Sequence, residues 1–93
     1  MTASERARVH LLVSGRVQGV FFRRAVADKA RVFNITGWAR NLADGRVEVY
    51  ASGSPAQLDE LEARLRMGPP HADIRGFEAA EAPVTDASGF SIR

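Results

Sequence analysis

The stretch GRVQGVFFRR, Gly15 to Arg24, decides how this chain folds, because it separates two segments with different apolar patterns. The residues before it, 9–14, form a short apolar run rich in valine and leucine, which is typical of a central strand. The residues after it carry apolar side chains at helical spacing and predict a helix over 22–33. These side chains are Phe22, Ala25, Val26, Ala30 and Phe33. The quoted stretch is therefore expected to be a loop between a strand and a helix.

Two further strands follow as a predicted hairpin. The ranges 35–42 and 46–52 are connected by a segment in which Asp44 and Gly45 supply the residues of a tight turn. In the second arm, apolar and polar residues alternate from Val47 to Ser52. This alternation indicates that one face of the strand is buried and that the other is exposed to water.

The second predicted helix has clear signals at both ends. Ser54 can cap its first turn, Pro55 suits the first helical position, and Gln57 completes a capping box. The helix is expected to end at Gly68, which is followed by two prolines. Its core stripe consists of Leu58, Leu61 and Leu65.

The last part of the chain completes the order of elements. Strands are predicted over 74–82 and, at an edge of the sheet, over 90–93. The whole order predicts an α+β fold, a ferredoxin-like βαββαβ sandwich in which an antiparallel sheet carries two helices on one face. A length of 93 residues fits a single domain with one modest core. We expect this domain to span residues 1–93, with residues 1–6 as a flexible N-terminus.

The composition limits the classes of protein to which the chain can belong. Hydrophobic residues make up 45% and charged residues 26%, as in ordinary folded domains. The chain contains no cysteine, so disulfides and thiolate metal sites are excluded. The sequence shows neither a signal peptide nor an apolar run long enough to cross a bilayer. We therefore expect a cytoplasmic protein without a membrane partner, and we take it to be a monomer.

The net charge of +2 gives little support to nucleic-acid binding. The basic residues are scattered and alternate with acidic ones instead of forming a block. A ferredoxin-like RNA-binding domain would need aromatic side chains at stacking positions on its strands. The strand aromatics Trp38, Tyr50, Phe77 and Phe90 match no such motif. We expect no nucleic-acid partner.

The two arginines of the quoted stretch lie where the helix dipole disfavours positive charge. An arginine in the first turn costs roughly 0.3 to 1 kcal/mol, and residues 21–24 include no Asp, Ser or Thr that could cap the helix. Gly15 and Gly19 bracket a loop whose N–H groups could form an anion-binding nest. Arg23 could reach back over this loop, whereas Arg24 points about 100° further round the helix. Solvated arginines beside an ordinary glycine turn remain the alternative.

Other polar residues form no convincing catalytic pattern. His10 and His71 lie in a strand and a loop, and they make no metal-binding pair with carboxylates. Asp28 and Asp44 are spread over a helix and a turn, where solvated side chains are usual. Ser14 lacks the surrounding residues of a nucleophile elbow. The residues thus predict neither a metal site nor a covalent serine mechanism.

Two motifs of the chain closely resemble the signatures of a known family. The acylphosphatase family has signatures similar to VSGRVQGVFFR, Val13 to Arg23, and to GWARN, Gly37 to Asn41, at this spacing. The similarity continues through DGRVEVYASG at 44–53, GPP at 68–70 and the closing FSIR. Ala39 stands where the family usually has valine, and the closing residues depart from F-x-I-x-Y. The resemblance covers nearly the whole chain and implies the fold already inferred.

The resemblance also implies an activity, the hydrolysis of the carboxyl–phosphate bond of a small-molecule acyl phosphate to a carboxylate and inorganic phosphate. Arg23 would bind the phosphate, and Asn41 would orient the attacking water. Backbone N–H groups would surround the phosphate oxygens along Arg16, Val17, Gln18, Gly19 and Val20. Such a reaction needs mainly positioning and stabilisation of charge. We expect neither a metal ion nor a cofactor.

A second interpretation is a protein of the same fold that binds its ligand without catalysing a reaction. Acylphosphatase-like domains occur within larger maturation proteins, and the chain would then be a non-catalytic module that binds an acyl- or carbamoyl-phosphate group. Such domains normally lie beside other domains, so a chain of 93 residues favours the enzyme.

Overall fold

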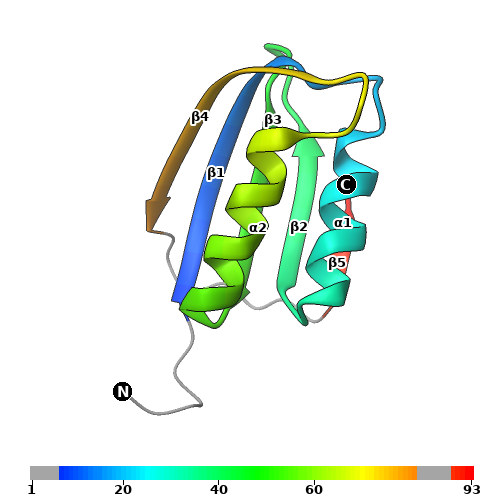
Figure 1. Cartoon of the computed structure of the whole chain (residues 1–93). Coiled ribbons are helices and arrows are strands. Elements are labelled where there is room, and N and C mark those ends of the chain that lie inside the picture. Colours follow the sequence, from blue (N-terminus) through cyan, green and yellow to red (C-terminus); the bar gives the residue numbers. More distant parts are fainter. Residues whose placement is uncertain (1–6, 82–88) are drawn as a thin grey trace.

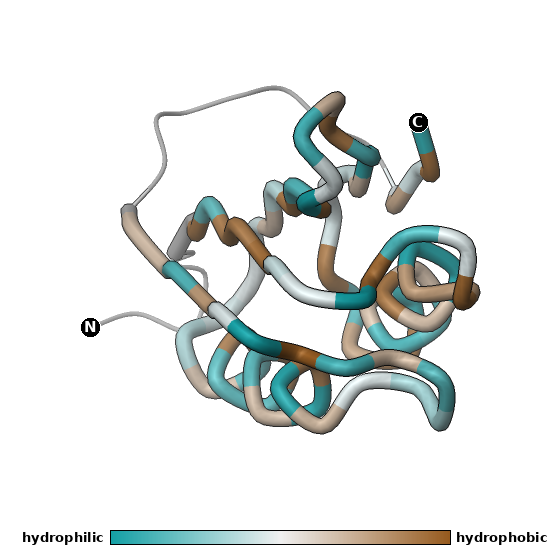
Figure 2. The backbone as a smooth tube through the Cα atoms, turned by 90° about the horizontal axis from the view of Figure 1, so that it is seen from above, coloured by the Kyte–Doolittle hydropathy of each residue, from teal (hydrophilic) through white to brown (hydrophobic). Residues whose placement is uncertain are grey.

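In the residues that the structure describes, 7–81 and 89–93, the chain forms a five-stranded sheet with two helices (Figure 1). This computed structural model has the elements β1 (Ala7–Arg16), α1 (Phe22–Val32), β2 (Thr36–Asn41), β3 (Val47–Gly53), α2 (Pro55–Met67), β4 (Asp73–Glu81) and β5 (Phe90–Ile92). The strands lie in the order β4-β1-β3-β2-β5. Both helices cover the same face of the sheet, as Figure 2 shows from above. The predicted ferredoxin-like α+β fold is confirmed.

The last strand differs in direction from the prediction. β1 pairs antiparallel with β3 and β4, and β2 pairs antiparallel with β3. β5 instead pairs parallel with β2, with Gly37 beside Phe90 and Ala39 beside Ile92. The sheet is therefore mixed, and the expected antiparallel pairing holds for β1 to β4 only. The reason is topological, because β4 runs opposite to β2 and a chain that turns back after β4 runs in the direction of β2.

The hydrophobic core fills the space between the helices and the sheet. Its largest fully buried side chains are Phe22, Leu11, Ile35, Leu61, Val13, Val17, Val26, Val47 and Val49. α2 buries the predicted stripe of Leu58, Leu61 and Leu65. Ala25 on α1 and Phe33, the C-cap residue that follows it, are only half-buried, and Ala27 takes a buried position that the spacing did not predict. Both helices thus pack on the sheet through the expected faces, with a small shift in α1.

The ends of α2 follow their predicted signals. The N–H of Gln57 donates to Oγ of Ser54 at 3.3 Å, and Pro55 occupies the first turn. The predicted capping box is only half formed, because among the described residues the Gln57 side chain makes no hydrogen bond back to Ser54. Gly68 follows the last helical residue with a φ of 67°, a conformation that favours glycine. In the described part of the chain, neither helix is long and apolar enough to cross a membrane.

Several predicted boundaries differ from the observed ones by a few residues. β1 extends beyond the predicted range 9–14 at both ends, and α1 ends at Val32 instead of Phe33. The last residue predicted for the fourth strand, Ala82, lies outside the described residues, as does the expected flexible N-terminus, residues 1–6. Such shifts leave the order of elements unchanged.

The turn between β2 and β3 is built by the predicted Asp44 and Gly45. Oδ1 of Asp44 accepts the backbone N–H of Arg46 at 3.0 Å, and Oδ2 accepts from the Arg46 guanidinium at 2.8 Å. Gly45 takes a φ of 95°, and its N–H donates to the carbonyl of Leu42 at 3.2 Å. The hydrogen bond from the Arg46 backbone holds the pKa of Asp44 below its usual value. A charged Asp44 therefore closes the turn.

The face of β3 that is turned away from the helices is less exposed than the alternation predicted. Tyr50 and Ser52 are only 3% and 8% exposed. The predicted wet face is wrong at these positions because β3 lies in the middle of the sheet, where side chains of its neighbours cover it. The Trp38 ring stacks on Tyr50 with 6.0 Å between ring centroids. The guanidinium groups of Arg40 and Arg93 lie over Trp38 in turn.

Candidate active site

The loop after β1 carries the chain through residues 17–21 before α1 begins. Val17 and Val20 anchor the loop, since both side chains are buried in the core. The N–H of Val17 donates to the carbonyl of Gly15 at 3.1 Å. Gly15 has a φ of 113°, and a Cβ at this residue would lie 2.1 Å from the carbonyl oxygen of Asp73 on β4. Only glycine fits here, so the loop begins in close contact with β4.

Backbone N–H groups of this loop and of the first turn of α1 are free. In the part of the chain that the structure describes, no N–H from Gln18 to Arg24 has a hydrogen-bond acceptor. The first helical bond runs from the N–H of Ala25 to the carbonyl of Phe21 at 3.0 Å. Phe21 is the N-cap residue, with a left-handed φ of 61° and no side-chain cap. Unpaired N–H groups at the positive end of a helix attract anions.

A cavity of about 310 Å³ lies beside this loop. Its lining residues are Val17, Gly19, Phe21, Phe22, Arg23, Arg24, Asn41 and Ile92. The cavity brings Arg23 in the first turn of α1 together with Asn41 at the end of β2. The two residues that the resemblance singled out for chemistry therefore share one site, which has the size of a small-molecule pocket.

The predicted loop residues contribute unequally to this cavity. Val17 and Gly19 line it, whereas Arg16, Gln18 and Val20 do not. Arg16 is still part of β1 and is exposed. The prediction was that the backbone N–H groups of these residues surround the phosphate oxygens. Among the described residues, the N–H groups of Gln18, Gly19 and Val20 have no acceptor and are free to do so. The N–H of Val17 is already engaged within the loop and is not available to a ligand.

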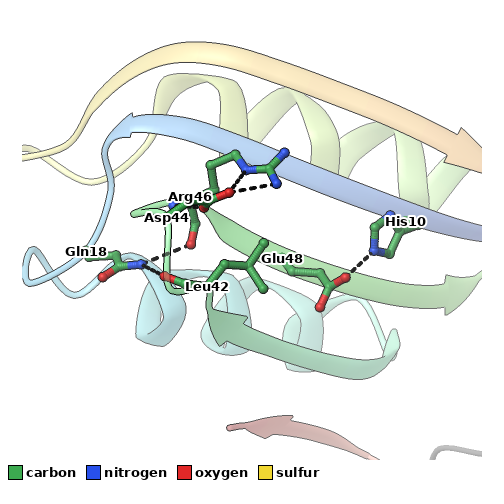
Figure 3. A network of polar contacts seen from close by, with 6 residues as sticks. All are labelled: His10, Gln18, Leu42, Asp44, Arg46 and Glu48. Carbon is green, nitrogen blue, oxygen red and sulfur yellow. Dashed lines mark hydrogen bonds and ion pairs between the residues drawn. The ribbon is translucent and has the colours of Figure 1, made fainter.

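The side chain of Gln18 ties the loop to the turn between β2 and β3 (Figure 3). Its Nε2 donates to the carbonyl oxygens of Leu42 at 2.8 Å and of Arg46 at 3.0 Å. Leu42 directly follows Asn41, so a side chain holds the loop beside the residue expected to orient water. No pattern in the sequence indicated these two acceptors, because they belong to a distant part of the chain.

The two arginines of the first turn have different partners. Nη1 of Arg23 donates to the backbone oxygen of Arg93 at 2.5 Å, which anchors the guanidinium near the end of β5. Nε of Arg24 lies 3.5 Å from Oδ1 of Asp28, one turn further along α1. Among the described residues, Arg23 is paired with no Asp or Glu side chain. The other N–H groups of its guanidinium remain available to an anion in the cavity.

The ion-paired side chains of β1, β2 and β3 lie outside the cavity. Nε2 of His10 is 2.6 Å from Oε2 of Glu48, and Nε of Arg40 donates to the other carboxylate oxygen (Figure 3 shows the first pair). Burial raises the pKa of Glu48, but the hydrogen bonds from His10 and Arg40 outweigh it and hold the pKa below its usual value. Within 7–81 and 89–93, no three His, Asp or Glu side chains gather to hold a metal ion.

Comparison with known proteins agrees with this geometry. Residues 9–92 match the acylphosphatase family. The chain is similar to an acylphosphatase of Rubrobacter xylanophilus, with 45% identity over 99% of this chain and 84% of that protein. It is also similar to the solved structure of an acylphosphatase from Coxiella burnetii, with 40% identity, a TM-score of 0.92 and 100% of both chains covered. The structure of HypF from T. kodakarensis matches with 30% identity and a TM-score of 0.82, over 96% of this chain and 12% of that one.

The fold and the cavity together define a class of small α+β proteins that can bind an anion between a strand–helix loop and the edge of a sheet. The match over residues 9–92 narrows this class, and the chain belongs to the acylphosphatase family. Its activity is the hydrolysis of acyl phosphates.

Four residues of the cavity lining were not among the predicted site residues: Phe21, Phe22, Arg24 and Ile92. Arg24 was expected to point away from the loop, yet it lines the same cavity as Arg23. Phe21 lies within the first motif. The signal available in the sequence was an aromatic residue at the N-cap of the helix, where a side chain that can cap the helix is usual. Ile92 reaches the cavity because β5 lies next to β2, and no periodicity in the sequence indicates that pairing.

Proposed function

We propose that the chain hydrolyses a small-molecule acyl phosphate in this cavity, where Arg23 and the free N–H groups from Gln18 to Arg24 bind the phosphoryl group and Asn41 orients the attacking water. One observation carries the proposal: free N–H groups, an arginine without an Asp or Glu partner and a neutral amide lie at one cavity. Phosphoryl transfer depends chiefly on such positioning and charge stabilisation.

The phosphoryl group carries its charge on oxygens that accept several hydrogen bonds at once. N–H groups at the start of α1 add the partial positive charge of the helix dipole. Arg23 retains donors after its bond to Arg93, because a guanidinium has five N–H groups in a planar fork. Two of them can donate in parallel to phosphoryl oxygens and so fix the orientation of the substrate.

Asn41 provides a neutral amide at the end of β2. Its oxygen can accept a hydrogen bond from water without bringing negative charge near the phosphate. The water oxygen bonds to phosphorus while the bond from phosphorus to the acyl oxygen breaks, and the carboxylate leaves with the electron pair. The proton of the water passes to the phosphate. Because the carboxylate is a good leaving group, orientation of the water supplies what the reaction needs, without a general base.

The proposal includes the setting in which the protein works. The scheme uses Arg23, Asn41 and N–H groups of this chain and needs no group from a second subunit, so the protein is expected to act as a monomer. The chain has no cysteine, which suits the reducing environment of the cytoplasm. The scheme above also uses no metal ion and no cofactor, and the protein is expected to act without either.

Variants of Arg23 and Asn41 separate binding from chemistry. Arg23→Lys should lose phosphate affinity and turnover nearly as far as Arg23→Ala does, because an ammonium cannot donate two parallel hydrogen bonds. Asn41→Ala should keep phosphate binding and lower kcat by about 10² or more. Calorimetry with inorganic phosphate measures the affinity, and steady-state hydrolysis of acetyl phosphate by chelator-treated protein measures the turnover. Arg64→Lys, an exposed substitution on α2, is the matched control.

Each outcome bears on a separate part of the proposal. If the wild-type protein binds phosphate and hydrolyses nothing, the chain is the non-catalytic module. If Asn41→Ala keeps the full kcat, the role given to that residue is wrong. Activity that disappears on chelation and returns with one divalent ion would contradict the metal-free scheme. Circular dichroism shows that each variant remains folded.

A further inference from the structure

A second cavity, of about 210 Å³, lies between the two helices. Both helices cover one face of the sheet, and the segment after α2 passes toward the start of α1 (Figure 1). The lining residues therefore come from α1, from the end of α2 and from that segment. They include Ala25, Lys29, Arg64, Leu65, Met67 and Pro69. None of them lines the cavity that holds Arg23 and Asn41, so the two cavities are separate.

The lining of this second cavity offers apolar surface that the core leaves uncovered. Leu65 is buried, and Ala25 beside it is only half-buried, although its helical spacing predicted a core position. Met67 is 79% exposed. A methionine side chain is flexible and polarizable, and it adapts its shape to an apolar ligand. An apolar group that enters the cavity removes this surface from water, which is favourable.

Two positive charges border the apolar surface. Within 7–81 and 89–93, the ammonium of Lys29 on α1 makes neither an ion pair nor a hydrogen bond. On α2, Nε of Arg64 lies 3.8 Å from Oε2 of Glu60, and both side chains are exposed. Such a pair is weak, so the Arg64 guanidinium can turn to another anion. None of the residues that line this cavity is acidic. The charge of the cavity is therefore complementary to an anion.

We infer that this cavity binds a small monocarboxylate with a short apolar chain. The chain lies against Ala25, Leu65 and Met67, and the carboxylate lies at Lys29 and Arg64. The planar guanidinium matches the geometry of a carboxylate. Inorganic phosphate would leave the apolar surface exposed to water, and it is therefore the poorer ligand. The volume is below the roughly 300 Å³ at which pockets for larger ligands begin, which limits the chain to a few methylenes.

Titrations with butyrate and hexanoate test this inference. Amide NMR spectra of the wild-type protein locate the site and give both Kd values. Hexanoate should shift the signals of Ala25, Lys29 and Leu65 and leave those of Gly19 and Asn41 in place. The two additional methylenes should lower the Kd by about tenfold, since each gains up to about fourfold when buried. Shifts confined to Gly19 and Asn41, or no saturable shifts up to the solubility limit of hexanoate, overturn the inference.

Variants of the lining separate the apolar contact from the charge. Ala25→Leu fills the cavity with a good helix former and should weaken hexanoate binding by about tenfold or more. Lys29→Gln should weaken it by about two- to fivefold, as for an exposed charge pair, and Lys29→Arg should restore it. Arg66→Gln removes a charge of α2 outside this lining and is the matched control. Arg64→Lys keeps its positive charge and so does not alter the charge of the cavity.

Arg23→Ala distinguishes this site from the cavity of the proposed reaction. Hexanoate should bind this variant with the wild-type Kd, because Arg23 does not line the second cavity. A Kd that rises in Arg23→Ala and stays unchanged in Ala25→Leu places hexanoate at the first cavity and overturns the inference. If Ala25→Leu and Lys29→Gln both keep the wild-type Kd, the inference is equally wrong. Circular dichroism shows that each variant is folded.

Discussion

The hydrogen bonds of the Gln18 side chain can be removed with little change in its size. Gln18→Met keeps an unbranched side chain of similar length but cannot donate to the carbonyl oxygens of Leu42 and Arg46. Neither oxygen is left without a donor, since Leu42 accepts the N–H of Gly45 at 3.2 Å and Arg46 accepts the N–H of Leu42 at 2.8 Å. The substitution therefore costs the net value of two hydrogen bonds and leaves no orphaned carbonyl.

That net value sets the expected magnitude. A typical intramolecular hydrogen bond contributes roughly 0.5 to 1.5 kcal/mol, so Gln18→Met should lower the free energy of unfolding by about 1 to 3 kcal/mol. Urea unfolding followed by the fluorescence of Trp38 measures the change. Because the same bonds hold the loop beside Asn41, kcat for acetyl phosphate should also fall, by up to about 10²-fold if the groups shift by about 1 Å.

Gln57→Met is the matched control for this prediction. Gln57 is half-buried on α2, and among the described residues its backbone N–H, not its side chain, makes a hydrogen bond. The same substitution there should change the free energy of unfolding by no more than about 0.5 kcal/mol. If Gln18→Met destabilises the protein no more than Gln57→Met does, its two hydrogen bonds do not hold the loop in place.

Two further substitutions examine the core and the charged network. Leu61→Ala removes a fully buried side chain of α2 and should lower the free energy of unfolding by roughly 2 to 5 kcal/mol. Urea unfolding measures the change, and a loss below about 0.5 kcal/mol would contradict the packing of this helix on the sheet. The pKa of Glu48 is lowered in the folded protein, so the stability it contributes is present above its unfolded pKa and is lost as the pH falls through the folded pKa. Thermal unfolding from about pH 7 to about pH 3 should show a larger loss of stability in the wild type than in Glu48→Gln, and equal losses would refute a stabilising role of the Glu48 charge.

Features that depend on a few neighbouring residues were predictable from the sequence. The Ser54 cap on the backbone N–H of Gln57 and the turn at Asp44 and Gly45 are examples, because the donor and acceptor in each lie within three positions of one another. The burial of Tyr50 was not predictable in this way. It depends on which strands become neighbours in the sheet, as does the parallel direction of β5.

The candidate site shows the same division. Arg23 and Asn41 were indicated by the two motifs, and the structure places both at one cavity. The acceptors of the Gln18 side chain and the approach of Ile92 were not indicated. These contacts join segments that are distant in the sequence, and neither spacing nor composition carries information about them. Phe21 lay within a motif, but only its left-handed conformation and its exposure show that its side chain is unusual.

The position of β1 in the sheet has a consequence for the kinetics of folding. Val13 of β1 pairs with Val47 of β3 and with Phe77 of β4, so β1 has no partner close to it in the sequence. β2 and β3 can pair locally, whereas β1 joins only after long loops have closed, and domains rich in such distant pairings fold slowly. A chain that has formed only the local hairpin already contains Asn41, yet the loop at the end of β1 is not beside it. Recovery of catalytic activity during refolding therefore reports the closing of the central sheet, whatever the rate at which the helices form.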